Sequence, residues 1–204
     1  FYRPPLHETI RIDGGDGDDL ASFAIGHGEP EAFRTVALTI DLGAGNDRLV
    51  LPHLVRGTQV TLGEGQDRIV IGEDYFDAEY YQSDSTYSED PLRILDFQAG
   101  LGGDVIELDR IAWGPGWNML DNPFATGHLR LEQSGADTLI RHDYDGNDSG
   151  TSISTIARIV GVNASSLTAH NLSGYAPDGS PSGFAIAPAT SGDDYLFGSY
   201  AGDT

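Results

Sequence analysis

The sequence predicts an all-β solenoid, a chain of short strands that stack coil upon coil. Short segments in which every second residue is apolar alternate with turns, and no long stretch has a helical period. Glycine-rich turns that end in aspartate recur along the same region, and two of them, at Gly43 and Gly63, lie 20 residues apart. This spacing accommodates two short strands and two turns, which together make one full coil.

Four turns share one pattern. Glycine occupies the second and fourth places, aspartate the sixth, and an aliphatic residue or alanine the eighth. The turns are Gly14–Asp19, Leu42–Asp47, Leu62–Asp67 and Ala99–Asp104. Side chains two apart on a strand face the same side, so the alternating segments beside each turn can stack their apolar residues into one interior. We expect the glycine turns to share one edge of the solenoid and ordinary loops to form the other.

The turns resemble the calcium-binding nonapeptide of repeat-in-toxin (RTX) proteins, G-G-x-G-x-D-x-U-x. This resemblance implies a right-handed parallel β-roll. It extends to Arg93–Gly100 and Asp104–Leu108, which are similar to the segment that ends the roll in the C-terminal regions of secreted metalloproteases. The strands that follow are also similar, so the likeness covers about residues 10–172. A long insertion precedes the fourth turn, which makes the last site the most divergent one.

Calcium prefers six to eight oxygen ligands, and two stacked turns can supply them where one cannot. Stacked coils lie about 4.8 Å apart, and facing aspartates would repel by roughly 3 kcal/mol per pair at a dielectric constant near 20. The expected pairs are Asp19 with Asp47, Asp47 with Asp67, and Asp67 with Asp104, holding about three ions. The resemblance assigns carbonyl ligands to Gly15, Gly17, Gly43, Gly45, Gly63, Gly65, Gly100 and Gly102. The alternative is a metal-free β-solenoid with plain Gly-Asp turns.

The chain divides into four expected regions. Residues 6–112 form the calcium-binding roll, and residues 113–174 form a β-rich antiparallel cap packed on it. Residues 175–189 are a linker, and residues 190–204 begin a further RTX repeat array, as in a piece of a longer protein. Within the cap we expect three antiparallel strands and one short helix. These are Leu129–Glu132, Thr138–Arg141, Ile153–Val160 and the helix in Asn163–Leu172, capped by Asn163 or Ser165.

Charge and composition exclude several classes of function. The chain of 204 residues has 32 acidic and 11 basic residues and a net charge of −21, which disfavours nucleic acid and anionic membranes as partners. A compact chain this acidic needs bound cations. The absence of cysteine rules out disulfides and thiolate metal sites, and suits an exported bacterial protein. The six histidines are scattered and no H-E-x-x-H occurs, so we do not expect an enzyme.

Two weaker candidates remain. Asp143, Asp145 and Asn147 alternate oxygen ligands as a calcium loop does, although ordinary hairpin turns have the same composition. The long loop at Glu73–Pro91 is rich in aromatic residues, which can stack on sugars, anchor peptides or simply cover the back edge of the roll. Its candidate ligand-binding residues are Tyr75, Tyr80 and Tyr81.

The sequence therefore predicts a calcium-binding module that is a structural part of a large secreted protein. Its partners would be calcium and the rest of the parent polypeptide. The resemblance implies export by type I secretion and folding outside the cell or on the surface of a Gram-negative bacterium, where calcium is available. Two alternatives stay open: a polysaccharide- or peptide-binding module, and an assembly module of adhesin or S-layer type.

Overall fold

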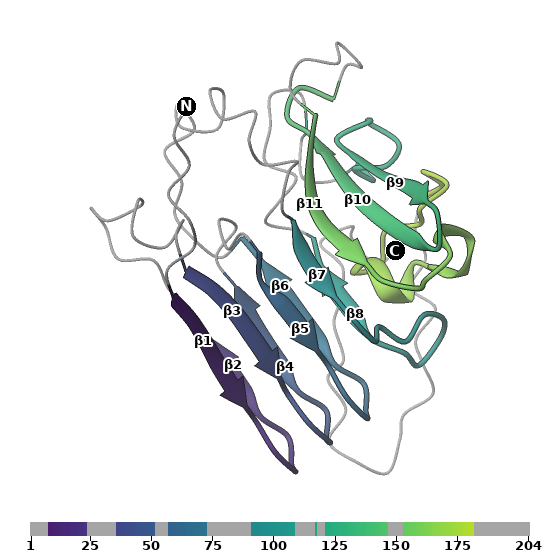
Figure 1. The fold of residues 1–204 in the computed structure, drawn as a ribbon. Helices are drawn as coiled ribbons and strands as arrows, with labels where there is room; N and C mark the ends of the chain where they lie inside the picture. The colour runs from purple at the N-terminus through teal and green to yellow at the C-terminus, as the bar shows by residue number, and fades with distance from the viewer. Residues whose placement is uncertain are drawn as a thin grey trace.

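The structure is a computed structural model that describes residues 8–23, 36–51, 57–72, 91–108, 117, 121–146 and 153–181. Within these ranges the regular structure is almost entirely β-strand, arranged as one seven-stranded and one four-stranded sheet (Figure 1). No helix in the described ranges has the length and apolar character needed to cross a membrane. The fold is the parallel β-roll with an antiparallel cap that the sequence predicts.

Successive strands of the roll alternate between the two sheets, so each coil gives one strand to each. The larger sheet holds β1 (Glu8–Asp13), β3 (Val36–Asp41), β5 (Gln59–Thr61) and β7 (Leu92–Ile94). The smaller sheet holds β2 (Leu20–Ser22), β4 (Arg48–Leu51), β6 (Arg68–Ile71) and β8 (Val105–Glu107). All neighbouring pairs among these strands are parallel.

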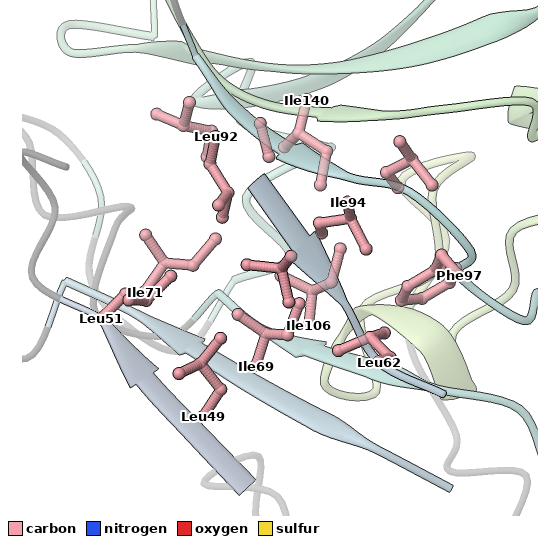
Figure 2. Packing of buried hydrophobic residues seen from close by; sticks show 14 of the residues in the cluster. Leu49, Leu51, Leu62, Ile69, Ile71, Leu92, Ile94, Phe97, Ile106 and Ile140 are labelled. Atoms are coloured by element: carbon pink, nitrogen blue, oxygen red, sulfur yellow. The ribbon is translucent and has the colours of Figure 1, made fainter. Parts of the chain in front are cut away.

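The core is a set of ladders in which equivalent residues of successive coils lie side by side. Leu49, Ile69 and Ile106 occupy one register position of the smaller sheet, and all three are fully buried. Val60 and Ile94 occupy one position of the larger sheet and are fully buried too. The close view in Figure 2 shows Leu49, Ile69 and Ile106 meeting Ile94 between the sheets. Alternation in the sequence thus decides which side of each strand is buried.

The cap continues the larger sheet. β11 (Ile153–Ile159) pairs in parallel with β7, and β10 (Asp137–Asp143) and β9 (Leu129–Ser134) follow in antiparallel order. The three antiparallel strands lie where the sequence predicts them. The edge left by β7, the last strand that the roll gives to this sheet, is thereby paired by the cap (Figure 1).

The single short helix expected in 163–172 is instead two 3-10 turns, η2 (Ala164–Ser166) and η3 (His170–Leu172). Asn163 caps the first, since its side chain accepts a hydrogen bond from Ser165 N at 2.9 Å. Leu167 has an extended backbone between the two turns and is 3 % exposed. The helix is interrupted where the chain buries this leucine in the core.

Candidate metal centre

Each glycine turn connects a strand of the larger sheet to the next strand of the smaller one, so the turns gather along one edge of the roll (Figure 1). The first three stack directly, with bridges that join Asp16 to Ala44 and Ala44 to Glu64. The approach is so close that a Cβ on Gly63 would overlap the carbonyl oxygen of Gly43. Glycine is therefore required for the stacking itself.

The sixth-position aspartates form one column across all four turns. Asp19 N donates to Asp47 Oδ1 at 2.8 Å, and Asp47 N donates to Asp67 Oδ1 at 2.8 Å. Asp67 N donates to Asp104 Oδ1 at 3.0 Å. Asp47, Asp67 and Asp104 are each almost completely buried. The structure thus brings together the three pairs expected from the sequence.

The second carboxylate oxygen of three of these aspartates has no partner. Oδ2 of Asp19, Asp47 and Asp67 is buried and accepts no hydrogen bond. Oδ2 of Asp104, by contrast, accepts a 2.7 Å hydrogen bond from Gln98 N. A buried carboxylate oxygen without a donor or a cation costs free energy, because it has lost its hydrogen bonds to water and no other interaction replaces them. The first three turns therefore each present one oxygen that fits a cation.

Burial and mutual repulsion weaken the acidity of the column. Burial raises the pKa of Asp67 to about 7, and the charges of Asp104, Asp47 and Asp96 add to the effect. Burial also raises the pKa of Asp104 to about 6. The pKa of Asp47 is raised as well, first by burial and then by the charges of Asp19 and Asp18. A bound cation would favour the ionised form of all three.

A second ladder at the fifth position lies beside the first and was not predicted from the sequence. Asp18 Oδ1 accepts from Asn46 N at 2.7 Å, and Asn46 Oδ1 accepts from Gln66 N at 3.0 Å. This ladder runs in the opposite direction, because here the earlier side chain accepts from the later backbone. The available signal was a polar side chain at the fifth place of the first three turns, which Gly103 lacks in the fourth.

The glycine carbonyls assigned by the resemblance lie at the contacts between turns. Gly15 O accepts from Ala44 N, and Gly43 O accepts from Glu64 N. The Gly17 carbonyl lies against Gly45, and the Gly45 carbonyl lies against Gly65. A carbonyl oxygen has two lone pairs, so one hydrogen bond leaves it able to bind an ion.

The gap between the third and fourth turns is built differently. Gln66 Nε2 donates to Gly102 O at 2.8 Å, and Gln98 Nε2 donates to Gly63 O at 3.3 Å. The Asp96 carboxylate accepts from Leu62 N at 2.8 Å and from Gly63 N at 2.9 Å. Side-chain groups thus take up contacts that backbone groups make between the earlier turns. Val60 and Ile94 are register partners, but Asp67 follows Val60 by 7 positions whereas Asp104 follows Ile94 by 10, and Asp96 and Gln98 lie in this longer connection.

The far side of the fourth turn is closed by the cap. Asn171 of η3 is fully buried, accepts from Gly100 N at 2.9 Å, and donates to Gly100 O at 3.0 Å and to Asp104 O at 2.9 Å. His170 Nε2 lies 2.9 Å from Gly103 O. These two residues occupy the place where a fifth turn would stack. Sequence reasoning missed them.

The structure describes only part of the two weaker candidate sites. Asp143 is 1 % exposed and its Oδ2 lies 3.2 Å from the Arg130 guanidinium, so a cation from the protein already faces it. Asn147, Tyr75, Tyr80 and Tyr81 lie outside the described residues. The described residues contain no group of three or more acidic or histidine side chains that could hold a metal ion. Any ion on the aspartate column would therefore need backbone carbonyls to complete its ligands.

One further buried group lies in the cap. His142 of β10 is 4 % exposed, and its Nε2 has no hydrogen-bond partner. Burial lowers the pKa of His142 to about 4, and the nearby His128 contributes to this. The ring is therefore neutral at physiological pH.

No protein-family model and no curated protein sequence matches the chain. Among solved structures, the chain is similar to the R3 subunit of a mannuronan C5-epimerase from Azotobacter vinelandii. The identity is 22%, the match covers 96% of this chain and 100% of that chain, and the TM-score is 0.41. The R2 subunit from the same enzyme is similar at 20% identity, over 83% of this chain and 91% of that chain, with a TM-score of 0.30.

Proposed function

We propose that this chain is a calcium-binding β-roll module that folds on binding Ca2+ and acts as a structural part of a larger secreted bacterial protein. One observation carries the proposal. Three aspartates in a single column, Asp19, Asp47 and Asp67, each keep a buried carboxylate oxygen without a partner. Such oxygens in a chain with a net charge of −21 are best explained by bound cations.

Calcium fits the residues better than other common cations do. The site offers only carboxylate and carbonyl oxygens, which suit a hard cation. Magnesium demands octahedral geometry and releases its waters reluctantly, so it suits a column of turns poorly. Asp19, Asp47 and Asp67 would hold the ions together with glycine carbonyls of the stacked turns. The ions would supply positive charge that removes the repulsion along the column.

The first two gaps between turns would bind most strongly. Both have an unpartnered oxygen on each side, from Asp19 and Asp47 in one case and from Asp47 and Asp67 in the other. In the third gap both oxygens of Asp104 already have hydrogen-bond donors. The side-chain amides of two glutamines also donate to the glycine carbonyls there. We therefore assign two strong sites and one weaker site.

The cellular setting is part of the proposal and is supported by the RTX-like turns. A module held together by calcium stays unfolded where calcium is scarce, which suits export by type I secretion from a Gram-negative bacterium. Extracellular calcium modules bind with dissociation constants of roughly 10⁻⁴–10⁻³ M, so they load outside the cell. A column of carboxylates and carbonyls suits a structural role and not a catalytic one.

The test is a calcium titration followed by circular dichroism and calorimetry. In chelator the chain should be only partly folded, with a weaker β-rich spectrum and a lower melting temperature, and calcium should produce the full β-rich spectrum with a cooperative thermal transition at a higher temperature. Magnesium at the same concentration should restore little of the signal. A β-rich spectrum with the same melting temperature in chelator as in calcium would refute the proposal.

A further inference from the structure

The roll has a closed end and an open end within the described residues. At the closed end the cap covers the last strand of each sheet, since β11 pairs with β7 and Ser173 bonds the free side of β8. The Ser173 hydroxyl donates to Ile106 O at 2.9 Å and accepts from Leu108 N at 3.2 Å. At the other end, β1 and β2 are the end strands of their sheets (Figure 1). An edge of this kind offers unpaired backbone groups to another strand.

The core-facing side chains of β1 are less well covered than those of the next coil. Ile12 is in register with Ile40, which is 1 % exposed, yet Ile12 is only partly buried. Ile10 is 47 % exposed, although its register partner Leu38 is buried. A further strand beside β1 would cover both isoleucines.

The unpaired backbone groups of β1 can be identified from its pairing with β3. Gly14 N donates to Asp41 O, which directs Gly14 toward β3. Backbone groups alternate in direction along a parallel strand. The N–H and C=O groups of Arg11 and Asp13 therefore point away from β3, and the side chains of both residues are exposed.

The same reasoning applies to β2. Phe23 N donates to Val50 O, which directs Phe23 toward β4. The N–H and C=O groups of Leu20 and Ser22 therefore point away from β4 and toward the open end. Both sheets thus present unpaired backbone groups at the same end of the roll.

We propose that a second copy docks on this end with its β1 antiparallel to the first β1, so that Arg11 of each copy lies opposite Asp13 of the other. Opposite residues of an antiparallel pair exchange two hydrogen bonds when their backbone groups face each other, as those of Arg11 and Asp13 do here. Their opposite charges add two favourable cross-strand pairs. In this register Ile12 lies opposite Ile12 of the other copy. A shift of one strand by two residues would instead place Arg11 opposite Arg11 or Asp13 opposite Asp13, and like charges in such positions repel.

The smaller sheets can pair at the same time. The twofold axis that relates the two β1 strands is perpendicular to the sheets, so it also brings the two β2 strands together in antiparallel order. Leu20 of each copy then lies opposite Ser22 of the other, and these are the residues whose backbone groups point outward. Leu20 is 67 % exposed in the single copy. Both sheets would therefore continue across the contact.

The charges and the cap favour this arrangement over a head-to-tail stack. The cap occupies the far end of the roll, so the open end of one copy meets its equivalent only on another copy. Parallel docking would place the acidic turn Gly14–Asp19 beside its counterpart, whereas antiparallel docking places the two turns at opposite edges of the roll. A contact between identical surfaces closes on itself, so association stops at a dimer. The contact uses no metal ligand, and calcium matters to it only by holding the first coil in place.

The test is sedimentation velocity of the full chain in calcium at several concentrations, with circular dichroism on the same samples. The average mass should rise with concentration from one copy to two and go no higher. Ser22→Pro removes a backbone N–H from the open edge without removing a bond to β4, and should weaken the dimer. Ser22→Ala keeps this N–H and should dimerise as the unchanged chain does. A sample with the β-rich spectrum that stays monomeric at every concentration, or that forms larger assemblies, would overturn the proposal.

Exchanging the charges tests the register. Arg11→Asp and Asp13→Arg each turn both cross-strand pairs into like charges, so each variant alone should dimerise at least about tenfold more weakly. A mixture of the two variants restores an opposite charge at both pairs and should form a dimer with one copy of each. The double variant Arg11→Asp/Asp13→Arg should also dimerise. Single variants that dimerise with unchanged affinity, or a mixture that gains no affinity over them, would overturn the proposal.

Discussion

The backbone N–H of Asp47 donates to the carboxylate of Asp67 at 2.8 Å, although 20 residues separate them and both side chains are 1 % exposed. One oxygen of Asp67 is satisfied by this bond, and the other has no partner. The aspartate therefore has two roles. It fixes the register of neighbouring coils through Oδ1, and in the proposed function it binds a cation through Oδ2.

These two roles predict opposite effects of Asp67→Asn with and without calcium. The amide oxygen can still accept from Asp47 N, but the variant loses the negative charge. We expect weaker calcium binding and a lower melting temperature in saturating calcium. In chelator the same variant should be at least as stable as the unchanged chain, because repulsion along the column is reduced. Calorimetry in both buffers measures this.

Asp16→Asn is the matched control for that change. Asp16 lies in a glycine turn and is exposed, so its replacement removes the same charge outside the column. It should change the free energy of unfolding by less than about 0.5 kcal/mol in either buffer. Equal losses of calcium affinity in both variants would contradict a specific role for the column.

Calcium binding should release protons near pH 6. The pKa of Asp67 is about 7 and that of Asp104 about 6 in the calcium-free fold, both raised from 3.8 by burial. The stability that these raised pKa values contribute is present below pH 3.8 and is lost as the pH rises through about 7. Calcium competes with the protons, so its affinity should rise across this window and level off above it.

Titration calorimetry at pH 6 in two buffers with different ionisation enthalpies measures the released protons. At pH 8 the buffer dependence should vanish and serves as the control. Binding heats that are independent of the buffer at pH 6 would show that the column is already ionised. His142 has a pKa lowered to about 4 and works in the opposite direction on overall stability, so the binding heats are more informative than the melting temperature.

The repeated part of this fold could be predicted from the sequence because each feature recurs. Alternating residues such as Leu49 and Ile69 mark the buried face, and the shared turn pattern puts Asp47 beside Asp67. The third gap could not be predicted in the same way. Asp96 and Gln98 have no counterparts in the earlier turns, because they lie in the longer connection between β7 and Asp104.

The cap was predicted as strands but not as a stop for the array. Asn171 contacts Gly100 across 71 residues of sequence, and a single asparagine carries no periodic signal. The parallel pairing of β11 with β7 is likewise a contact between distant segments. Local patterns show that such strands exist, whereas tertiary packing decides which edge they join.

Asn171→Ala should destabilise the protein in calcium and in chelator alike. The change removes the acceptor of Gly100 N and the side-chain donor to Asp104 O and Gly100 O, of which Gly100 O keeps its bond from Gly103 N, and Asn171 itself is fully buried. We expect a loss of roughly 2–4 kcal/mol in the free energy of unfolding. Urea unfolding measures the loss, and calorimetry should find the two strong calcium sites intact.

Asn163→Ala is the comparison for this variant. Asn163 caps the neighbouring 3-10 turn but is exposed, so its loss should cost about 1 kcal/mol or less. If both asparagine variants lose the same amount, the contact between η3 and the fourth turn does not stabilise the roll.

A pair of glycine substitutions separates turn conformation from turn stacking. Gly15 and Gly63 occupy the same place in their turns, with φ of 92° and 97°. An alanine at either position adopts an unfavourable backbone conformation, which costs roughly 1–3 kcal/mol. At Gly15 the added Cβ meets no atom within 4 Å, whereas at Gly63 it overlaps the carbonyl oxygen of Gly43.

Gly15→Ala should therefore fold in calcium with a modestly lower melting temperature. Gly63→Ala should lose more than about 4 kcal/mol and its calcium-induced β-sheet signal, as circular dichroism would record. If the two variants behaved alike, backbone conformation alone would explain these glycines, and the close stacking on which the proposed cation sites depend would be wrong.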